Sequence, residues 1–186
     1  MDTVSIAIVS HGDQEDVIDL LTSFEINRDP DINFELILLE NLSSQESFNY
    51  SDFGFPIKVI NNKKPAGLAK NINTIFQYVK GNYFCIINPD IVFNEIIFLG
   101  LINSIKNNDI DIIAPLIMGP EGKIQDSFRN IPNPFELIPR YFGRHTNIEL
   151  PSTEKIIYPE WLAGMFLFMK SELFHDLGGY NEKYFL

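Results

Sequence analysis

Polar residues gather at the points of the chain where short apolar runs end. These segments are Ser10-His11-Gly12, Glu40-Asn41, Asn61-Asn62 and Asn88-Pro89-Asp90. Carboxylate and amide oxygens are the ligands that hard divalent cations such as Mg²⁺ or Mn²⁺ take, which makes Asp90 and Asn88 candidate metal ligands. Such a cation can hold a diphosphate against a protein of negative charge. These residue types therefore suggest metal-assisted binding of a phosphorylated ligand.

A further polar group opens a predicted helix. Gly67 permits close approach of the backbone to a ligand, Asn71 can hydrogen-bond one, and Lys70 carries a positive charge. Each feature also has a simpler interpretation. Gly67 and Asn71 are ordinary choices near a helix start, Lys70 is typical of a solvated surface, and the segments at the strand ends are typical of turns. Taken alone, no segment identifies a site, so the positions of these segments in the fold must show whether they form one.

The elements that must position these residues follow from hydrophobic patterning. Short apolar runs predict strands at residues 4–9, 34–39, 57–60, 83–87 and 110–114. Helical spacing of apolar residues predicts helices that carry residues 17–24, 68–79 and 95–106. Such alternation indicates an α/β fold with a mostly parallel sheet and helices on both faces. The polar segments then belong at the carboxyl ends of the strands, where ligands bind to such sheets.

The character of the sequence changes after residue 115. Gly119-Pro120-Glu121-Gly122 predicts a hairpin turn, and four prolines interrupt regular structure before residue 160: Pro132, Pro134, Pro139 and Pro151. We interpret residues 115–159 as an excursion of hairpin and loop. Beyond it, the pattern predicts a strand at 165–169, a short helix capped by Ser171, and a stop at Gly178-Gly179.

Composition excludes several classes of protein. The 186 residues carry 14 Lys+Arg and 25 Asp+Glu, a formal net charge of −11, and 45% of them are hydrophobic. A basic face for nucleic acid is absent, because the longest Lys/Arg cluster is Lys63-Lys64. The single Cys85 lies in an apolar run and cannot form an internal disulfide, which fits the cytoplasm. No signal peptide and no apolar stretch of about 18 residues is present.

Several motifs of nucleotide and metal chemistry are also missing from the sequence. The glycines never fall as G-x-G, and Gly122-Lys123-Ile124 is not a P-loop. The three histidines stand far apart beside one cysteine, so no zinc spacing is present.

Taken in order, the segments resemble the family 2 inverting glycosyltransferases, whose Rossmann-like nucleotide-binding domain is called GT-A. The resemblance covers nearly the whole chain, and Asn88-Pro89-Asp90 falls where the family has its D-x-D motif. The other matching segments are Val4–His11, Leu38–Ser43, Gly67–Asn71, Trp161–Phe166, Lys170–Phe174 and Gly178–Tyr180. On this basis we expect a single GT-A domain, with a nucleotide-sugar-binding half at residues 1–115 and the start of an acceptor-binding half at 116–186.

The resemblance also implies roles for individual residues. Those expected to bind the nucleotide sugar are Ser10, His11, Gly12, Glu40, Asn41, Gly67, Lys70, Asn71, Asn88 and Asp90. Asp90, with Asn88 in place of the family's first Asp, would bind Mg²⁺ or Mn²⁺ at the diphosphate. Residues expected near the donor sugar and acceptor are Trp161, Gly164 and Met165.

The implied reaction is metal-dependent inverting transfer of a sugar from a nucleoside diphosphate to a saccharide or lipid-linked saccharide. The Asn-Pro-Asp and Trp-Leu-Ala-Gly-Met-Phe segments are most similar to rhamnosyltransferases of polysaccharide biosynthesis, which use dTDP-rhamnose; UDP-sugars remain open as donors. We expect a cytoplasmic protein, with room for peripheral association at the inner face of the cell membrane. The family's general base follows the segment that ends here at Leu186, so we expect a C-terminally truncated and inactive fragment without a catalytic residue.

Two alternatives stay open at this point. A sugar-1-phosphate nucleotidyltransferase also begins with a nucleotide-binding parallel sheet, but it needs a glycine-rich basic loop after the first strand, and here residues 11–16 are acidic. A non-catalytic nucleotide- or saccharide-binding domain fits the missing base. Failure to bind any nucleotide would favour that second alternative.

Overall fold

The structure, a computed structural model, describes residues 1–42, 49–125, 127–129 and 156–184. The chain divides into two compact units. The first unit comprises Met1–Ile113 and Met165–Leu186, and the second comprises Ala114–Gly164. The candidate residues of the strand ends all lie in the first unit.

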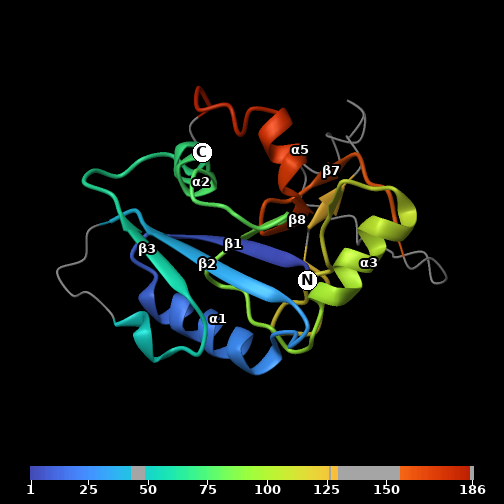
Figure 1. Cartoon of the computed structure of the whole chain (residues 1–186), viewed down its shortest axis with the longest axis horizontal. Coiled ribbons are helices and arrows are strands. Elements are labelled where there is room, and N and C mark those ends of the chain that lie inside the picture. Colours follow the sequence, from blue (N-terminus) through green and yellow to red (C-terminus); the bar gives the residue numbers. More distant parts are fainter. Residues whose placement is uncertain (43–48, 126, 130–155, 185–186) are drawn as a thin grey trace, which may run out of the picture. The chain divides into compact units, whose positions relative to one another are not determined.

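A six-stranded sheet in the order β3-β2-β1-β4-β8-β5 forms the first unit (Figure 1). Its strands are β1 Thr3–Ser10, β2 Asn33–Glu40, β3 Ile57–Asn61, β4 Tyr83–Ile87, β5 Ile112–Ile113 and β8 Phe166–Lys170. The β3, β2, β1 and β4 strands run parallel, whereas β8 is antiparallel to both β4 and β5. The expected mostly parallel α/β sheet is therefore confirmed.

Helices cover both faces of this sheet, as expected. They are α1 Gln14–Asn27, α2 Leu68–Phe76, α3 Phe98–Asn108 and α5 Ser171–Asp176, with a 3-10 turn η1 at Tyr50–Asp52. Phe24 of α1 packs edge-on against Phe34 of β2, and Phe76 of α2 packs against Phe84 of β4. Phe34 and Tyr83 both pair with Val4 of β1, so their side chains lie on the same face of the sheet. Phe84 follows Tyr83 along β4, so its side chain points to the other face. The α1 and α2 helices therefore lie on opposite faces (Figure 1).

The remaining two helices extend these layers. Phe98 of α3 contacts Phe24 and Phe34 on the α1 face, with ring centroids 6.1 and 5.0 Å away. Phe174 of α5 contacts Phe76 and Phe84 on the α2 face. Burial on both faces explains why β1, β2 and β4 read as nearly continuous apolar runs.

Some element boundaries differ from those predicted. The α3 helix begins at Phe98 rather than at residue 95, because its buried positions start there. The α2 helix ends at Phe76, and Val79 follows it in a tighter turn whose amide donates to the Phe76 carbonyl. The β5 strand keeps only residues 112–113, because it is an edge strand that pairs with β8 alone.

The predicted cap of the last helix is wrong. The α5 helix begins at Ser171 itself, after Lys170, and no side chain caps it. The Ser171 hydroxyl instead donates to the Gly81 carbonyl at 2.7 Å. The predicted stop is confirmed, because Gly178 and Gly179 follow the helix with φ angles of +73° and +76°.

The hairpin predicted in the second unit is confirmed. Met118 and Ile124 form an antiparallel bridge around the turn, and Gly122 adopts a φ of +70°. Two short strands, β6 Phe128–Arg129 and β7 Trp161–Leu162, pair antiparallel elsewhere in this unit. The four prolines expected to interrupt regular structure, at 132, 134, 139 and 151, lie outside the described residues. Within the described ranges, no helix is long and apolar enough to cross a membrane.

Candidate functional site

Two polar turns lie side by side where the sheet topology reverses. The chain passes from β1 outward to β2 and β3, and then returns to place β4 on the other side of β1. Ile8 and Ile87 are the last registered pair between β1 and β4. The segments Ser10-His11-Gly12 and Asn88-Pro89-Asp90 follow directly at this edge. Open α/β sheets bind ligands at such a reversal, outside the carboxyl ends of the strands.

Asn41, directly after β2, is a buried hydrogen-bonding centre beside these turns. Asn41 is only 3% exposed. Oδ1 accepts from the Ala66 amide and from Asn62 Nδ2, both at 2.9 Å. Nδ2 lies 3.0 Å from the Ala66 carbonyl, to which it donates, and 2.8 Å from Nδ1 of His11. Every hydrogen-bonding position of this amide is therefore in use within the protein.

Asn62 and Asn71 continue the network across the sheet edge. Asn62 Nδ2 also donates to Asn71 Oδ1 at 2.9 Å, and Asn71 Nδ2 donates to the Ala66 carbonyl at 3.1 Å. Asn71 is only 1% exposed. The asparagine cluster, which we define as Asn41, Asn62 and Asn71, therefore ties the ends of β2 and β3 to the start of α2.

The turn after β1 presents one exposed ring and one buried hydroxyl. His11 is exposed, its amide donates to Asp13 Oδ2 at 3.1 Å, and Gly12 adopts a φ of +99°, which favours glycine. Ser10 is completely buried, and its Oγ has no hydrogen-bond partner among the described residues. A buried hydroxyl without a partner is uncommon and indicates a group that a ligand or a water satisfies.

Glu40 lies beside Ser10 on the α1 face of the sheet. The two residues are a registered pair of β2 and β1. The Tyr50 hydroxyl donates to Glu40 Oε1 at 2.8 Å, and Glu40 is only 6% exposed. Burial, together with the neighbouring Glu40 carboxylate, raises the pKa of Tyr50 far above its usual value. This tyrosine therefore remains a hydrogen-bond donor to Glu40 at any physiological pH.

The Asn88-Pro89-Asp90 turn meets Met165, another of the predicted residues. The Asn88 amide donates to the Met165 carbonyl at 2.9 Å, so the two segments lie together although they are distant in the sequence. Asn88 is half-buried and Asp90 is exposed. Among the described residues, no group of three His, Cys, Asp or Glu side chains could hold a metal by itself. The turn offers two hard oxygen donors, which fit Mg²⁺ or Mn²⁺ when a ligand and water supply the others.

The other predicted residues lie outside the two turns that follow β1 and β4. Gly67 precedes α2, and its carbonyl accepts the Asn71 amide at 3.1 Å; Lys70 is exposed on the first turn of that helix. Trp161 and Gly164 belong to the second unit, where Trp161 pairs with Arg129. Sequence reasoning named the Asn61-Asn62 turn but gave Asn62 no role, and it missed Ala66 altogether. Asn62 carried a signal, because it follows a strand, whereas Ala66 acts through its backbone and carried none.

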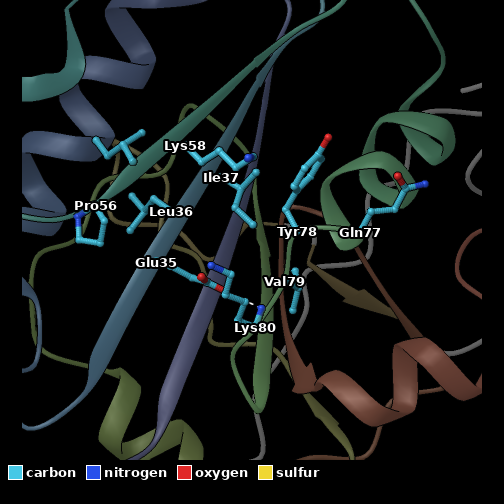
Figure 2. A pocket seen from close by; sticks show the side chains of 10 residues that line it. Glu35, Leu36, Ile37, Pro56, Lys58, Gln77, Tyr78, Val79 and Lys80 are labelled. Carbon is cyan, nitrogen blue, oxygen red and sulfur yellow. Dashed lines mark hydrogen bonds between the residues drawn. The ribbon is translucent and has the colours of Figure 1, made fainter.

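A separate depression of about 340 Å³ lies against the other half of β2, among β2, β3 and the segment after α2 (Figure 2). None of the predicted site residues lines it. The Lys58 ammonium lies 4.1 Å from the centre of the Tyr78 ring, and Glu35 Oε1 accepts the Lys80 amide at 2.6 Å. Because its lining residues lie away from the carboxyl ends of the strands, the depression is not part of the site at that edge.

Comparison with known proteins adds a family and a fold. Residues 5–170 match the family model described as Glycosyl transferase family 2. A structure of S. aureus TarS 1-349 superposes with a TM-score of 0.67 at 16% identity, covering 97% of this chain and 51% of that one. TarS 1-349 has also been solved with UDP. The mannosyltransferase PcManGT from Pyrobaculum calidifontis, solved with GDP-Man and Mn²⁺, superposes with a TM-score of 0.63 at 12% identity, covering 96% and 47%.

These similarities confirm the expected GT-A-like fold. The chain spans about half the length of these solved structures. A search of curated proteins found no match.

Proposed function

Because the chain belongs to glycosyl transferase family 2, we propose that it binds a nucleoside diphosphate sugar for metal-dependent, inverting transfer to a saccharide or lipid-linked saccharide. The observation that carries the proposal is the junction of two turns, Ser10-His11-Gly12 and Asn88-Pro89-Asp90, on the adjacent strands β1 and β4. The complexes of similar folds with UDP and with GDP-Man support a ligand of this class.

In this proposal the nucleoside lies along the ends of β1 and β2. Ser10, His11, Gly12, Glu40 and Asn41 border it. Ser10 is completely buried, so its hydroxyl, which no described residue engages, reaches the ligand only where binding opens the turn after β1. Gly67 and Lys70 face the ribose or diphosphate, and Asn71 supports them from its buried position in the asparagine cluster. The exposed Lys70 supplies positive charge in a chain of net charge −11.

Asp90 and Asn88 are the proposed ligands of a divalent cation, Mg²⁺ or Mn²⁺. Their oxygens fit such an ion, and a mannosyltransferase of similar fold was solved with Mn²⁺. When bound, the cation supplies Lewis-acid stabilisation of the negative charge on the departing nucleoside diphosphate. Asp90 is the stronger ligand because it is a carboxylate, and Asn88 holds the turn through its bond to Met165.

The proposal also covers the donor, the acceptor and the place of action. We take dTDP-rhamnose or a UDP-sugar as the donor, and we place Trp161, Gly164 and Met165 near the donor sugar and acceptor. A lipid-linked acceptor would bring the chain to the inner face of the cell membrane, in the cytoplasm. The proposal assigns no residue as general base. Glu182 in particular is exposed and accepts a hydrogen bond from Asn73 at 3.0 Å. Donor binding is therefore the property to test.

The test is calorimetric titration of the purified chain with UDP, dTDP and GDP, each with Mn²⁺ and with a chelator. We expect metal-dependent binding of one of them, and at least a tenfold loss of affinity in Asp90→Ala, about 1.4 kcal/mol. The fold should survive, because Asp90 is exposed. Asp31→Ala is the matched control, because Asp31 is an exposed turn aspartate at the opposite end of the sheet, before β2.

The outcomes separate the alternatives. Unchanged affinity in Asp90→Ala overturns the metal assignment while leaving nucleotide binding in place. Failure of the wild-type chain to bind any of the nucleotides overturns the proposal and favours a non-catalytic saccharide-binding domain.

A further inference from the structure

We propose that Asn41 holds His11 as the neutral tautomer with its proton on Nε2, so that His11 donates a hydrogen bond to an acceptor oxygen of the bound nucleotide. The nucleotide part of this inference rests on the function proposed above. The tautomer is a property of the free chain and can be measured without any ligand.

The backbone of Ala66 orients the Asn41 amide. The Ala66 amide can only donate and its carbonyl can only accept. The Ala66 amide lies 2.9 Å from Asn41 Oδ1, and the Ala66 carbonyl lies 3.0 Å from Asn41 Nδ2. A flipped side chain would bring donor against donor and acceptor against acceptor. Asn41 therefore has one orientation that satisfies both backbone groups.

Asn62 supports the same orientation. Its Nδ2 donates to Asn41 Oδ1 at 2.9 Å and to Asn71 Oδ1 at 2.9 Å, so both of its protons are used. Because Asn41 is only 3% exposed, water cannot replace these partners at low cost. The asparagine cluster and Ala66 together fix which atom of Asn41 faces His11.

The atom that faces His11 is the amide nitrogen. Asn41 Nδ2 lies 2.8 Å from His11 Nδ1, and an amide nitrogen can donate but cannot accept. Nδ1 must therefore accept, which requires that it carry a lone pair and no proton. In a neutral imidazole the proton then lies on Nε2.

This arrangement decides what His11 can do. With Nδ1 occupied and Nε2 protonated, the ring can donate a hydrogen bond and has no free nitrogen to take a proton as a general base. His11 is exposed and follows β1 at the topological reversal. A pyrimidine nucleotide offers acceptors of the required kind in its ring carbonyls and phosphate oxygens. Asn41, whose own bonds are all internal, acts through His11 as a positioning residue.

The first test reads the tautomer directly. In the free chain labelled with ¹⁵N-histidine, we expect the His11 Nδ1 resonance in the range of an unprotonated nitrogen and Nε2 in the range of a protonated one. His11→Phe assigns the signals among the three histidines. Asn62→Ala is the control. It removes a bond of the asparagine cluster, but Ala66 still orients Asn41, so the His11 proton should stay on Nε2. A proton on Nδ1 of the wild-type chain overturns the inference.

The second test is a double-mutant cycle of UDP affinity with His11→Phe, Asn41→Ala and the double variant. Each single variant should lose about threefold to tenfold, as expected for one hydrogen bond, and the double variant no more than His11→Phe alone. Additive losses would indicate that Asn41 does not act through His11. If Asn41→Ala does not fold, the wild-type tautomer and the His11→Phe affinity still decide.

The remaining arms locate the acceptor and separate this inference from the proposed function. Titration with uridine and with pyrophosphate shows whether His11→Phe weakens binding of the base or of the diphosphate. Tight UDP binding that His11→Phe leaves unchanged overturns this inference alone. Absence of UDP, dTDP and GDP binding by the wild-type chain overturns the nucleotide part together with the proposed function.

Discussion

Two serines of β1 show how a single hydroxyl can serve either the fold or a ligand. Ser5 and Ser10 are both completely buried. The Ser5 hydroxyl donates to Glu35 Oε1 and accepts the Gly81 amide at 2.8 Å, whereas the Ser10 hydroxyl has no partner among the described residues. The first serine stabilises the fold. The second costs free energy until something binds it.

Replacing each serine with alanine tests this difference. Ser10→Ala should leave the free energy of unfolding unchanged or raise it by about 1 kcal/mol, because it removes an unsatisfied buried group. The same variant should bind its nucleotide more weakly. Ser5→Ala is the control, and it should lose about 1–3 kcal/mol because it removes two buried hydrogen bonds, one to Glu35 Oε1 and one from the Gly81 amide. Urea unfolding measures both. An equal loss in the two variants would show that Ser10 is already satisfied in the free chain.

At the scale of elements, the turn between α2 and β4 joins several parts of the first unit. The Gly81 amide donates to Ser5 of β1, and its carbonyl accepts the hydroxyl of Ser171 at the start of α5. A β-carbon at Gly81 would lie 2.6 Å from the Thr3 carbonyl oxygen and 2.9 Å from the Ser5 amide. Backbone atoms of β1 cannot yield there without disturbing the strand. Glycine is therefore required by close approach rather than by its φ angle.

Gly81→Ala should lower the free energy of unfolding by about 2 kcal/mol or more, because overpacking against backbone cannot relax easily. Gly100→Ala is the matched control, because a β-carbon there meets nothing within 4 Å in the exposed part of α3. That control should gain about 0.5–1 kcal/mol, as alanine does over glycine within a helix. Thermal or urea unfolding measures the pair. Equal stability of the two variants would contradict the close contact.

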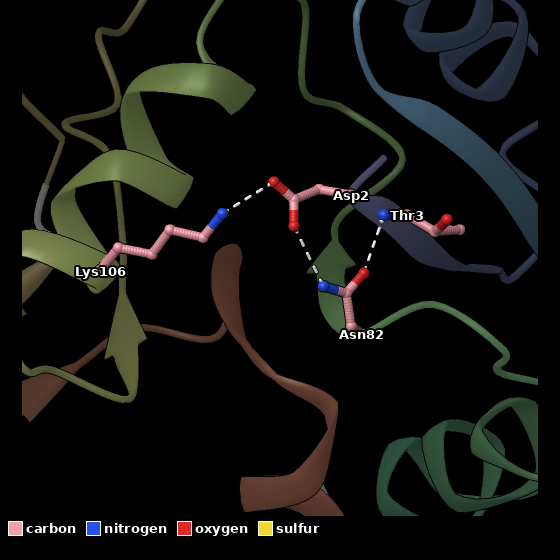
Figure 3. Close-up of polar contacts among 4 residues, drawn as sticks. All are labelled: Asp2, Thr3, Asn82 and Lys106. Carbon is pink, nitrogen blue, oxygen red and sulfur yellow. Dashed lines mark hydrogen bonds and ion pairs between the residues drawn. The ribbon is translucent and has the colours of Figure 1, made fainter.

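At the scale of the whole molecule, the chain has an excess of negative charge, so each ion pair between a lysine and a carboxylate reduces the repulsion among its carboxylates. Lys106 of α3 bonds Asp2 at 2.9 Å, and Asn82 joins Asp2 and Thr3 before β4 (Figure 3). The hydrogen bond from Lys106 holds the pKa of Asp2 below its ordinary value of 3.8. The group thus links the amino terminus to two elements that are distant in the sequence.

The pH dependence follows from the sign of this shift. Because the pKa of Asp2 is lower in the folded chain, its stabilising contribution is present above pH 3.8 and is lost as the pH falls through the folded pKa. Asp2→Asn should therefore be modestly less stable than the wild type at neutral pH, and the two should converge below that value. Unfolding curves of both proteins across pH 2–7 give the difference in their free energy of unfolding at each pH. Taking this difference cancels the general effect of the net charge, which the two proteins nearly share. A difference that stays constant with pH would contradict the assignment.

The family relationship is also a property of the whole molecule. At 12–16% identity to solved structures, only the superposition shows the shared fold, yet the order of short motifs along the chain already indicated the family. Individual motifs were weak because each resembles an ordinary turn. Their order was informative because ordinary turns in an unrelated protein would not match several of the family's motifs in the same order along the chain.

The sequence by itself determined which runs form β1, β2, β3 and β4 and which polar residues follow them, because apolar periodicity and turn residues act locally. Tertiary structure alone decided that β8 enters antiparallel beside β4, and that His11 and Asn41, 30 residues apart, share a hydrogen bond. It also decided that Ser10 is buried without a partner among the described residues while Ser5 is satisfied. Such pairings depend on strand order and register, which bring distant residues together. No local pattern of residues encodes them.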